Sequence, residues 1–169
     1  MENTLITGDR LSAIVKLLRT IPDEGVIIEA GVYKGGSLKT IAETVPNREV
    51  IGFDTFEGMP EQMWNKEEPH QPGDFSDVSI TFVKRFLNQN NNVTLVKGLF
   101  PFSADAYEHE KIAFAHLDLD FYESTKEALE WIWPRLVDGG IIVFDDYDWP
   151  NCPGVRKAIE EFGQIPQPT

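Results

Sequence analysis

Residues 26–31 (VIIEAG) and the segments that follow them decide the fold. A short apolar run that opens into glycine is typical of a buried strand followed by a tight turn. Residues 37–45 (SLKTIAETV) then show the spacing of a helix, and residues 49–53 (EVIGF) form a second apolar run that ends at Asp54. A strand, a helix and a second strand in this order predict a unit of parallel sheet.

The same alternation continues on both sides of this unit. Asp9 is predicted to cap the first helix, and Ser124 with Glu127 forms a capping box for a later one. The turn Asp138-Gly139-Gly140 precedes the last strand. The further helices are predicted at residues 8–20, 77–90, 124 to about 134 and 153–162, and the further strands at 93–96, 112–117 and 141–144. The sequence therefore predicts an α/β fold, a Rossmann-like, doubly wound, mainly parallel sheet.

One segment, residues 55–76, breaks this pattern. It contains three prolines and two glycines, yet it also carries the large apolar side chains Met59, Met63, Trp64 and Phe75. A loop of this length is either functional or disordered. Its apolar content favours an active-site lid.

Length and composition restrict the class of protein. The 169 residues, of which 41% are hydrophobic, suit a single domain spanning residues 1–169. No apolar run approaches the roughly 20 residues that cross a bilayer, and the one cysteine cannot form an internal disulfide, which favours the cytoplasm. A net charge of −13 without a Lys/Arg stripe makes nucleic acid a poor partner.

Chemically active residues gather at the predicted strand ends. In an open parallel sheet, ligands bind beyond the carboxyl ends of the strands. Four of the five predicted strands end in or beside carboxylates, and the third ends in Lys97-Gly98; the acidic residues are Glu29, Asp54, Asp118, Asp120, Asp145 and Asp146. The sequence therefore places a candidate site along this edge.

The first two strand ends indicate a nucleoside cofactor. Gly31 and Gly35-Gly36 let the backbone approach a ligand, and Asp54 is placed to accept hydrogen bonds from ribose hydroxyls. A dinucleotide fingerprint requires glycine where Tyr33 stands, which weakens an NAD interpretation. Glu29 suits a cofactor with cationic sulfonium and ammonium groups. The alternative is that these glycines form an ordinary tight turn.

The last two strand ends indicate a divalent cation. Asp118 with Asp120, and Asp145 with Asp146, form two acidic pairs on neighbouring strands, and such like charges need a cation or a proton between them. Hard oxygen ligands without a Cys or His pattern favour Mg²⁺, with Mn²⁺ or Ca²⁺ as alternatives, over structural zinc. The alternative is that these aspartates only cap helices and turns.

Histidine and aromatic residues near these strand ends carry weaker signals. His116 lies inside a predicted strand and is interpreted as a core histidine. His70 in the lid either faces substrate or is solvated, and Phe100 either covers an adenine face or belongs to the core. Trp64 and Trp149 lie in loops near the site, where a substrate wall and simple packing are equally supported.

Four segments carry a resemblance to a known family. They are residues 28–37 (IEAGVYKGGS), 53–60 (FDTFEGMP), 117–125 (LDLDFYEST) and 139–147 (GGIIVFDDY). The sequence resembles the macrocin O-methyltransferase family over residues 25–162. The resemblance implies a class I methyltransferase fold and S-adenosylmethionine (SAM) as cofactor. That fold continues into further C-terminal strands, which we expect to be missing or short here, and we expect the N-terminal segment that helps form the family's substrate pocket to be largely missing.

The resemblance also implies roles for individual residues. Glu29 and Gly31 would line the methionine end of the cofactor, and Asp54 would hold its ribose. Asp118, Asp145 and Asp146 would bind Mg²⁺, with Asp118 also a catalytic residue beside the cofactor. Asp120 is either a ligand or the proton acceptor. The remaining predicted cofactor contacts are Tyr33, Gly35, Ser37, Thr55, Gly98 and Phe100.

The predicted function is SAM-dependent, Mg²⁺-assisted methylation of a hydroxyl group on a small sugar-like or natural-product molecule. The family and the short sheet favour a homo-oligomer. Three alternatives stay open: an NAD-dependent oxidoreductase, a metal-dependent hydroxylase or hydrolase, and a non-catalytic cofactor-binding module.

Overall fold

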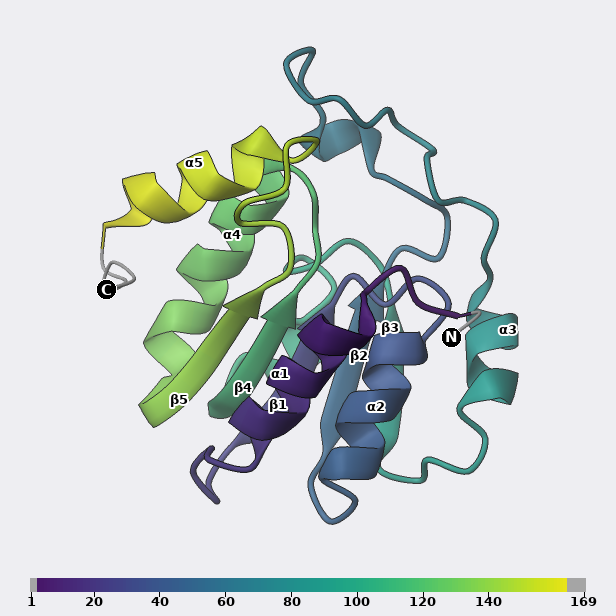
Figure 1. Cartoon of the computed structure of the whole chain (residues 1–169), viewed down its shortest axis with the longest axis vertical. Helices are drawn as coiled ribbons and strands as arrows, with labels where there is room; N and C mark the ends of the chain where they lie inside the picture. The colour runs from purple at the N-terminus through teal and green to yellow at the C-terminus, as the bar shows by residue number, and fades with distance from the viewer. Residues whose placement is uncertain (1–2, 164–169) are drawn as a thin grey trace.

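The computed structural model describes residues 3–163 and contains a five-stranded parallel sheet (Figure 1). The strands are β1 (Val26–Ala30), β2 (Val50–Asp54), β3 (Val93–Lys97), β4 (Ile112–Leu117) and β5 (Leu136–Phe144). Their order across the sheet is β3-β2-β1-β4-β5, with every neighbouring pair parallel. The predicted Rossmann-like α/β fold is confirmed.

Alternating side chains of the central strand feed two separate cores. Ile27 faces one layer of helices, whereas Ile28 faces the other, as the two-residue period of a strand requires. Both side chains are buried. Because both faces of the sheet are covered, β1 and β4 consist almost entirely of buried residues.

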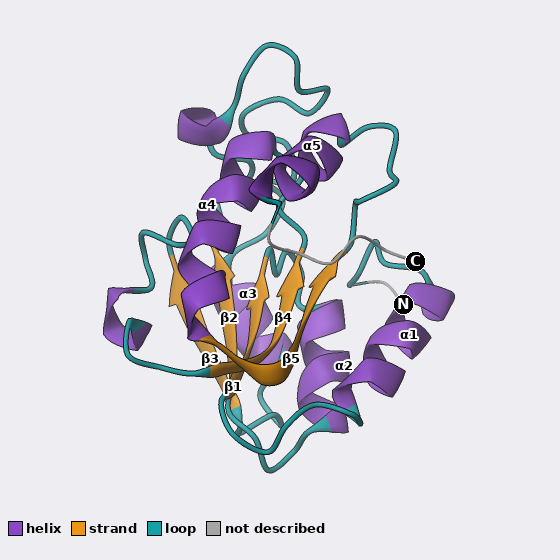
Figure 2. Ribbon diagram, turned by 90° about the vertical axis from the view of Figure 1, so that its left-hand side faces the viewer, coloured by secondary structure: helices purple, strands orange, loops and turns teal. Residues whose placement is uncertain are grey.

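The helices form one layer on each face of the sheet (Figure 2). On one face lie α1 (Gly8–Leu18), α2 (Gly36–Thr44) and α3 (Ile80–Phe86). On the other lies α4 (Tyr122–Ile132), against which α5 (Pro153–Phe162) packs through Val155 and Ile159. Short 3-10 turns occupy Glu61–Met63, Asp105–Tyr107 and Trp133–Arg135. None of the described helices is long and apolar enough to cross a membrane.

The helix predicted at 77–90 is shorter than expected. It begins after Ser79, whose hydroxyl accepts a hydrogen bond from the Phe82 N–H (3.2 Å), and it ends at Phe86. The asparagine-rich stretch that follows forms a turn instead. Asn92 donates to the carbonyl groups of Ala42, Val45 and Arg48, so its side chain supports the turn between α2 and β2.

Two predicted helix caps are wrong. The residue before α1 is Thr7, and no side chain caps this helix, while Asp9 lies in its first turn. Helix α4 begins at Tyr122, two residues before Ser124, so the predicted capping box does not form. Instead, Glu68 of the loop at 55–76 accepts a hydrogen bond from the Tyr122 N–H (2.9 Å). A side chain 54 residues away in the sequence therefore caps this helix in place of the predicted Ser124.

The last strand begins earlier than predicted. Strand β5 starts at Leu136 and includes Asp138-Gly139-Gly140, which was expected to be a turn. The register explains the difference: Ile112 pairs with Leu136 and Phe114 with Ile141, so five residues of β5 oppose two of β4. The two glycines therefore lie in an irregular bulge within the strand.

Candidate active site

A cavity of about 360 Å³ lies at the carboxyl ends of the strands. Its walls come from the loops after all five strands, from residues 3–10 and from the loop at 55–76. Eleven of the predicted site residues line it: Gly31, Tyr33, Ser37, Asp54, Thr55, Gly98, Phe100, Asp118, Asp120, Asp145 and Asp146. The structure thus brings together residues that are up to 115 positions apart in the sequence.

Gly31 joins the two sides of the cavity. Its φ is +92°, a conformation that favours glycine. A Cβ atom at this position would overlap the carbonyl oxygen of Asp118, which follows the neighbouring strand. The close approach of the backbones after β1 and β4 therefore requires that residue 31 has no side chain.

Asp54 organises the loops after β1 and β2. One carboxylate oxygen accepts hydrogen bonds from the N–H groups of Val32 and Tyr33 (both 2.8 Å), and the other accepts one from Phe56 N–H (2.6 Å). Tyr33 and Phe56 both have positive φ angles, +48° and +52°, which these bonds help to hold. A carboxylate offers about four acceptor positions. The Thr55 hydroxyl lies 3.5 Å from the second oxygen but donates at 2.8 Å to a backbone carbonyl, so the fourth position of Asp54 stays available to a ligand hydroxyl.

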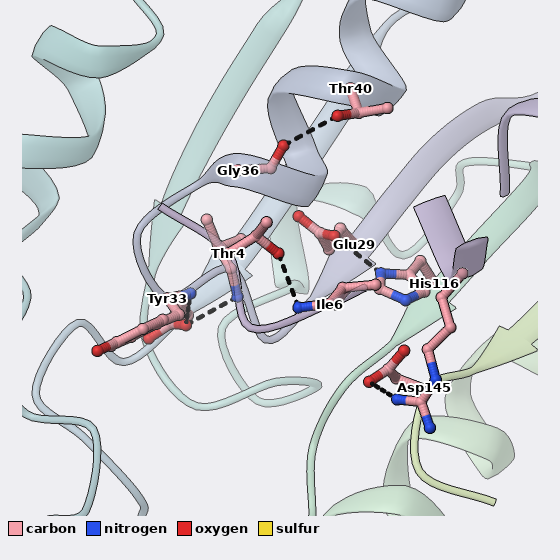
Figure 3. A network of polar contacts seen from close by, with 11 residues as sticks. Thr4, Ile6, Glu29, Tyr33, Gly36, Thr40, His116 and Asp145 are labelled. Atoms are coloured by element: carbon pink, nitrogen blue, oxygen red, sulfur yellow. Dashed lines mark hydrogen bonds and ion pairs between the residues drawn. The ribbon is translucent and has the colours of Figure 1, made fainter. Parts of the chain in front are cut away.

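Two predicted cofactor contacts, Glu29 and Gly35, do not line the cavity. Glu29 is fully buried, and its carboxylate lies 2.8 Å from the Nδ1 atom of His116. Figure 3 draws the two side chains pointing toward each other. Burial raises the pKa of Glu29, and hydrogen bonds from His116 and Ser37 oppose that rise. Glu29 is therefore set back from the cavity, whereas Ser37, which interacts with its carboxylate, lines the cavity. Gly35 precedes α2, and a Cβ atom at this position would lie against Val83.

Three aspartates form a cluster at the ends of β4 and β5. Carboxylate oxygens of Asp118, Asp145 and Asp146 all lie within 4.8 Å of one another. Burial, and then the neighbouring acidic charges, raise the pKa of Asp118 well above its ordinary value. The same causes raise the pKa of Asp146 to about 6. We call these three residues the carboxylate cluster.

The chemistry of the carboxylate cluster fits a divalent cation. One oxygen of Asp146 is buried and has no hydrogen-bond partner among the described residues. A buried oxygen without a partner is costly, and so is the close approach of three acidic groups. A hard cation such as Mg²⁺, which prefers oxygen ligands, would relieve both costs.

Asp120 lies beside the carboxylate cluster in a strained backbone conformation, with a φ of +58°. Its Oδ1 atom accepts a hydrogen bond from the Cys152 thiol (3.1 Å) and lies 3.9 Å from Nε2 of His70. Burial raises the pKa of Asp120, while the thiol's hydrogen bond opposes the rise. The placement of His70 was open from the sequence, and Cys152 was not among the predicted site residues. Their convergence on Asp120 has no local sequence signal.

The N-terminal segment is a further part of the site that sequence analysis missed. Asn3, Thr4, Leu5, Thr7 and Arg10 line the cavity. The carbonyl oxygen of Asn3 accepts a hydrogen bond from Gly36 N–H (2.8 Å), and the Thr4 side chain lies against Gly36. Residues 3–7 therefore cover the cavity at the start of α2.

The loop at 55–76 forms another wall, through Met59, Pro60, His70 and Phe75 among others. Its two arms pair with each other, because Met59 N–H donates to Asp74 O (2.8 Å) and Gly73 N–H donates to Met59 O (2.9 Å). Just beyond it, Asp77 accepts hydrogen bonds from the Tyr33 hydroxyl (2.7 Å) and the Lys34 ammonium group (2.6 Å). The loop is thus tied to the turn after β1.

The remaining aromatic residues divide between core and cavity. Trp149 lines the cavity and is about half exposed, whereas Trp64 does not line it. Phe100 does both, since it lines the cavity and packs against Phe53, with ring centroids 4.9 Å apart. His116 is a buried core residue, as predicted.

Comparison with known proteins places this geometry among methyltransferases. A family model described as macrocin-O-methyltransferase matches residues 1–168. A sugar O-methyltransferase of Streptomyces olivaceus, 8-demethyl-8-(2,3-dimethoxy-alpha-L-rhamnosyl)-tetracenomycin-C 4'-O-methyltransferase, is 29% identical over 96% of this chain and 68% of its own length. Mycinamicin III 3''-O-methyltransferase of Micromonospora griseorubida is 28% identical over 96% of this chain and 70% of its own length.

Solved structures agree with the sequence comparison. The calicheamicin methyltransferase CalS11 is 31% identical and superposes with a TM-score of 0.76, covering 90% of this chain and 68% of its own. The O-methyltransferase NovP is 24% identical, with a TM-score of 0.82 over 95% of this chain and 73% of its own, and that likeness shows the fold alone.

Proposed function

This chain belongs to the macrocin O-methyltransferase family, and from that premise we propose that it transfers a methyl group from SAM to a hydroxyl group of a sugar-like small molecule, assisted by Mg²⁺. The observation that carries the proposal is the carboxylate cluster, with its unpartnered Asp146 oxygen, on the wall of a cavity of about 360 Å³. That volume suits a small-molecule site.

Residues after β1, β2 and β3 would bind SAM, which supplies a methyl group already activated on a sulfonium. Ser37 and the Gly31 backbone would contact its methionine end, and the free acceptor capacity of Asp54 would take a ribose hydroxyl. Phe100 offers an aromatic face on the cavity wall for the adenine. Thr55, Gly98 and Tyr33 complete the predicted contacts.

The carboxylate cluster would hold the cation, whose Lewis acidity lowers the pKa of a nearby hydroxyl. Asp120 is the proton acceptor in this proposal. It lies within the cavity, and the Cys152 thiol holds one of its oxygens. The acceptor oxygen would gain the methyl group and lose its proton to Asp120, with S-adenosylhomocysteine (SAH) as the other product. Much of the rate enhancement would come from the orientation of the two reactants.

The loop at 55–76 serves as the lid in this proposal. Its Met59, Pro60 and Phe75 side chains would exclude water from the reaction. The names of two relatives, which mention a rhamnosyl-tetracenomycin and mycinamicin III, support a sugar-bearing acceptor. We propose that the acceptor is a hydroxylated sugar on a natural product. We also propose that this chain is a single domain that acts in the cytoplasm and self-associates.

The first test is calorimetric titration of SAH into the purified chain, with and without Mg²⁺, followed by turnover of SAM on a panel of glycosides. We expect saturable SAH binding and Mg²⁺-dependent methyl transfer. The double variant Asp145→Ala/Asp146→Ala should lose that transfer by a factor of about 100 or more. The matched control is Asp148→Ala, since Asp148 is exposed and pairs with Arg156 at the surface. Full metal-dependent turnover by the double variant would contradict the proposal.

A further inference from the structure

Arg10 reaches the carboxylate cluster from the other end of the chain. Its guanidinium Nη1 donates to Oδ2 of Asp145 at 2.8 Å, across 135 sequence positions, and the dashed line at Asp145 in Figure 3 marks this contact. The Asp145 side chain is only 10% exposed, whereas the Arg10 side chain is 40% exposed. The contact therefore joins a surface helix to a nearly buried carboxylate.

Arg10 is held in place from two directions. It belongs to the first turn of α1, which is anchored in the core by Ile14 and Leu18. Its guanidinium also lies 5.8 Å from the ring centroid of Trp149, in the loop after β5. A cation over an aromatic face is attracted to it, so the side chain has a defined position between Trp149 and Asp145.

We propose that Arg10 is a positioning residue for the cation site: it holds the Asp145 carboxylate in the orientation in which Asp145, with Asp118 and Asp146, takes a divalent cation. This inference rests on the proposed function, because it assumes that the carboxylate cluster binds a metal. It assigns a role to the N-terminal segment that neither the acidic motifs nor the strand ends reveal.

The hydrogen-bonding pattern supports this role. Arg10 occupies one oxygen of Asp145, and within residues 3–163 the other oxygen accepts no hydrogen bond. Carboxylates that bind metals are themselves held by outer hydrogen bonds, and loss of such a partner typically weakens metal binding 10- to 100-fold. Without Arg10, the Asp145 side chain would have to be ordered by the cation itself.

The opposing effect is repulsion between the guanidinium and the cation. Arg10 is partly exposed, so water and salt screen its charge, and its Nη1 contacts a single oxygen of Asp145, Oδ2, at 2.8 Å. Orientation is therefore expected to dominate over repulsion. The two effects predict opposite changes in metal affinity, which makes the inference directly testable.

The experiment is titration of the full chain with Mn²⁺ alone, followed by the electron paramagnetic resonance signal of free Mn²⁺. We expect Arg10→Gln to weaken Mn²⁺ binding about 10- to 100-fold. Arg10→Lys keeps a cation that can reach Asp145 and should recover part of the loss. Arg19→Gln, at an exposed position just after the same helix, is the matched control and should bind Mn²⁺ like the unaltered chain.

The outcomes separate the two proposals. Unaltered or tighter Mn²⁺ binding by Arg10→Gln, with the unaltered chain binding well, would overturn the role of Arg10 and leave the cation site intact. No Mn²⁺ binding by the unaltered chain would overturn the cation site and the role of Arg10 with it. Circular dichroism of each metal-free variant checks its fold, and Arg10→Lys decides the question if Arg10→Gln does not fold.

Discussion

The two halves of the cavity differ in how the carboxylates in their walls are hydrogen-bonded. In the half formed by the turn after β1 and the loop after β2, which we call the cofactor half, Asp54 accepts three backbone N–H bonds between 2.6 and 2.8 Å. In the half formed by the carboxylate cluster, which we call the metal half, acidic groups crowd together and one Asp146 oxygen has no partner.

This difference separates a carboxylate whose hydrogen bonds come from the protein backbone from the carboxylates that we propose bind a cation. Asp54 stabilises the fold, because each charged hydrogen bond that it accepts holds a loop in place. The metal half costs stability in the metal-free protein, because burial and repulsion oppose its charges. Four sets of variants test whether the two halves differ in this way, and Gly31→Ala has the largest expected effect.

Gly31→Ala should abolish the contact between the two halves. The new Cβ would overlap the Asp118 carbonyl oxygen at a φ of +92°, so we expect a loss of more than about 4 kcal/mol of unfolding free energy or no folded protein. The matched control is Gly73→Ala, whose φ is +86° but which has nothing within 4 Å, and which should cost about 1–2 kcal/mol. Urea unfolding measures both, and equal losses would show that the contact at Gly31 is unimportant.

The metal half should make the metal-free protein less stable as pH rises. The pKa of Asp146 is raised from 3.8 to about 6, so between these pH values the folded state keeps a proton on Asp146 that the unfolded state has lost. This difference contributes to the unfolding free energy in full below pH 3.8, and the contribution is lost as pH rises through about 6. At about 1.36 kcal/mol per pKa unit, the loss is at most about 3 kcal/mol.

Asp146→Asn should remove this part of the pH dependence. Urea unfolding in EDTA between pH 4 and 8, with the variant and the unaltered chain side by side, measures the difference. We expect the variant to gain relative stability as pH rises. An identical pH dependence for the two proteins would show that the Asp146 carboxyl carries no such cost.

Asp54→Asn should weaken the cofactor half. The amide keeps one acceptor oxygen but loses the charge, so we expect a loss of about 2 kcal/mol of unfolding free energy and about tenfold weaker SAH binding. Asp105→Asn, at an exposed position in a 3-10 turn, is the control and should change neither quantity. If Asp54→Asn binds SAH with full affinity, Asp54 acts on the backbone alone.

Asp77→Ala should have the smallest effect. It removes the exposed partner of Lys34 and of the Tyr33 hydroxyl, which ties the loop at 55–76 to the cofactor half. Hydrogen exchange of that loop should rise slightly at low salt, and the difference should fade at high salt because the ion pair is screened. Asp23→Ala, another exposed position, is the control. A large loss of protection against hydrogen exchange would mean that the contacts of Asp77 are the main interactions that order the loop.

Much of the site could be predicted because parallel strands share one edge. The apolar runs located all five strands, and the residues that follow them, among them Asp54, Asp118 and Asp145, were brought to one cavity by topology alone. Glu29 was misplaced for a related reason. It lies inside β1, where side chains point to the faces of the sheet, so it turns to His116 and away from the edge.

Local periodicity and chain topology are enough to predict the alternation of strands and helices and the edge at which the acidic residues meet. The side chains that surround those acids depend on how the folded chain packs. Arg10 pairs with Asp145, Glu68 caps α4, and Cys152 with His70 converges on Asp120. These partners lie 32 to 135 residues apart, and no local spacing encodes the packing that directs one side chain toward another.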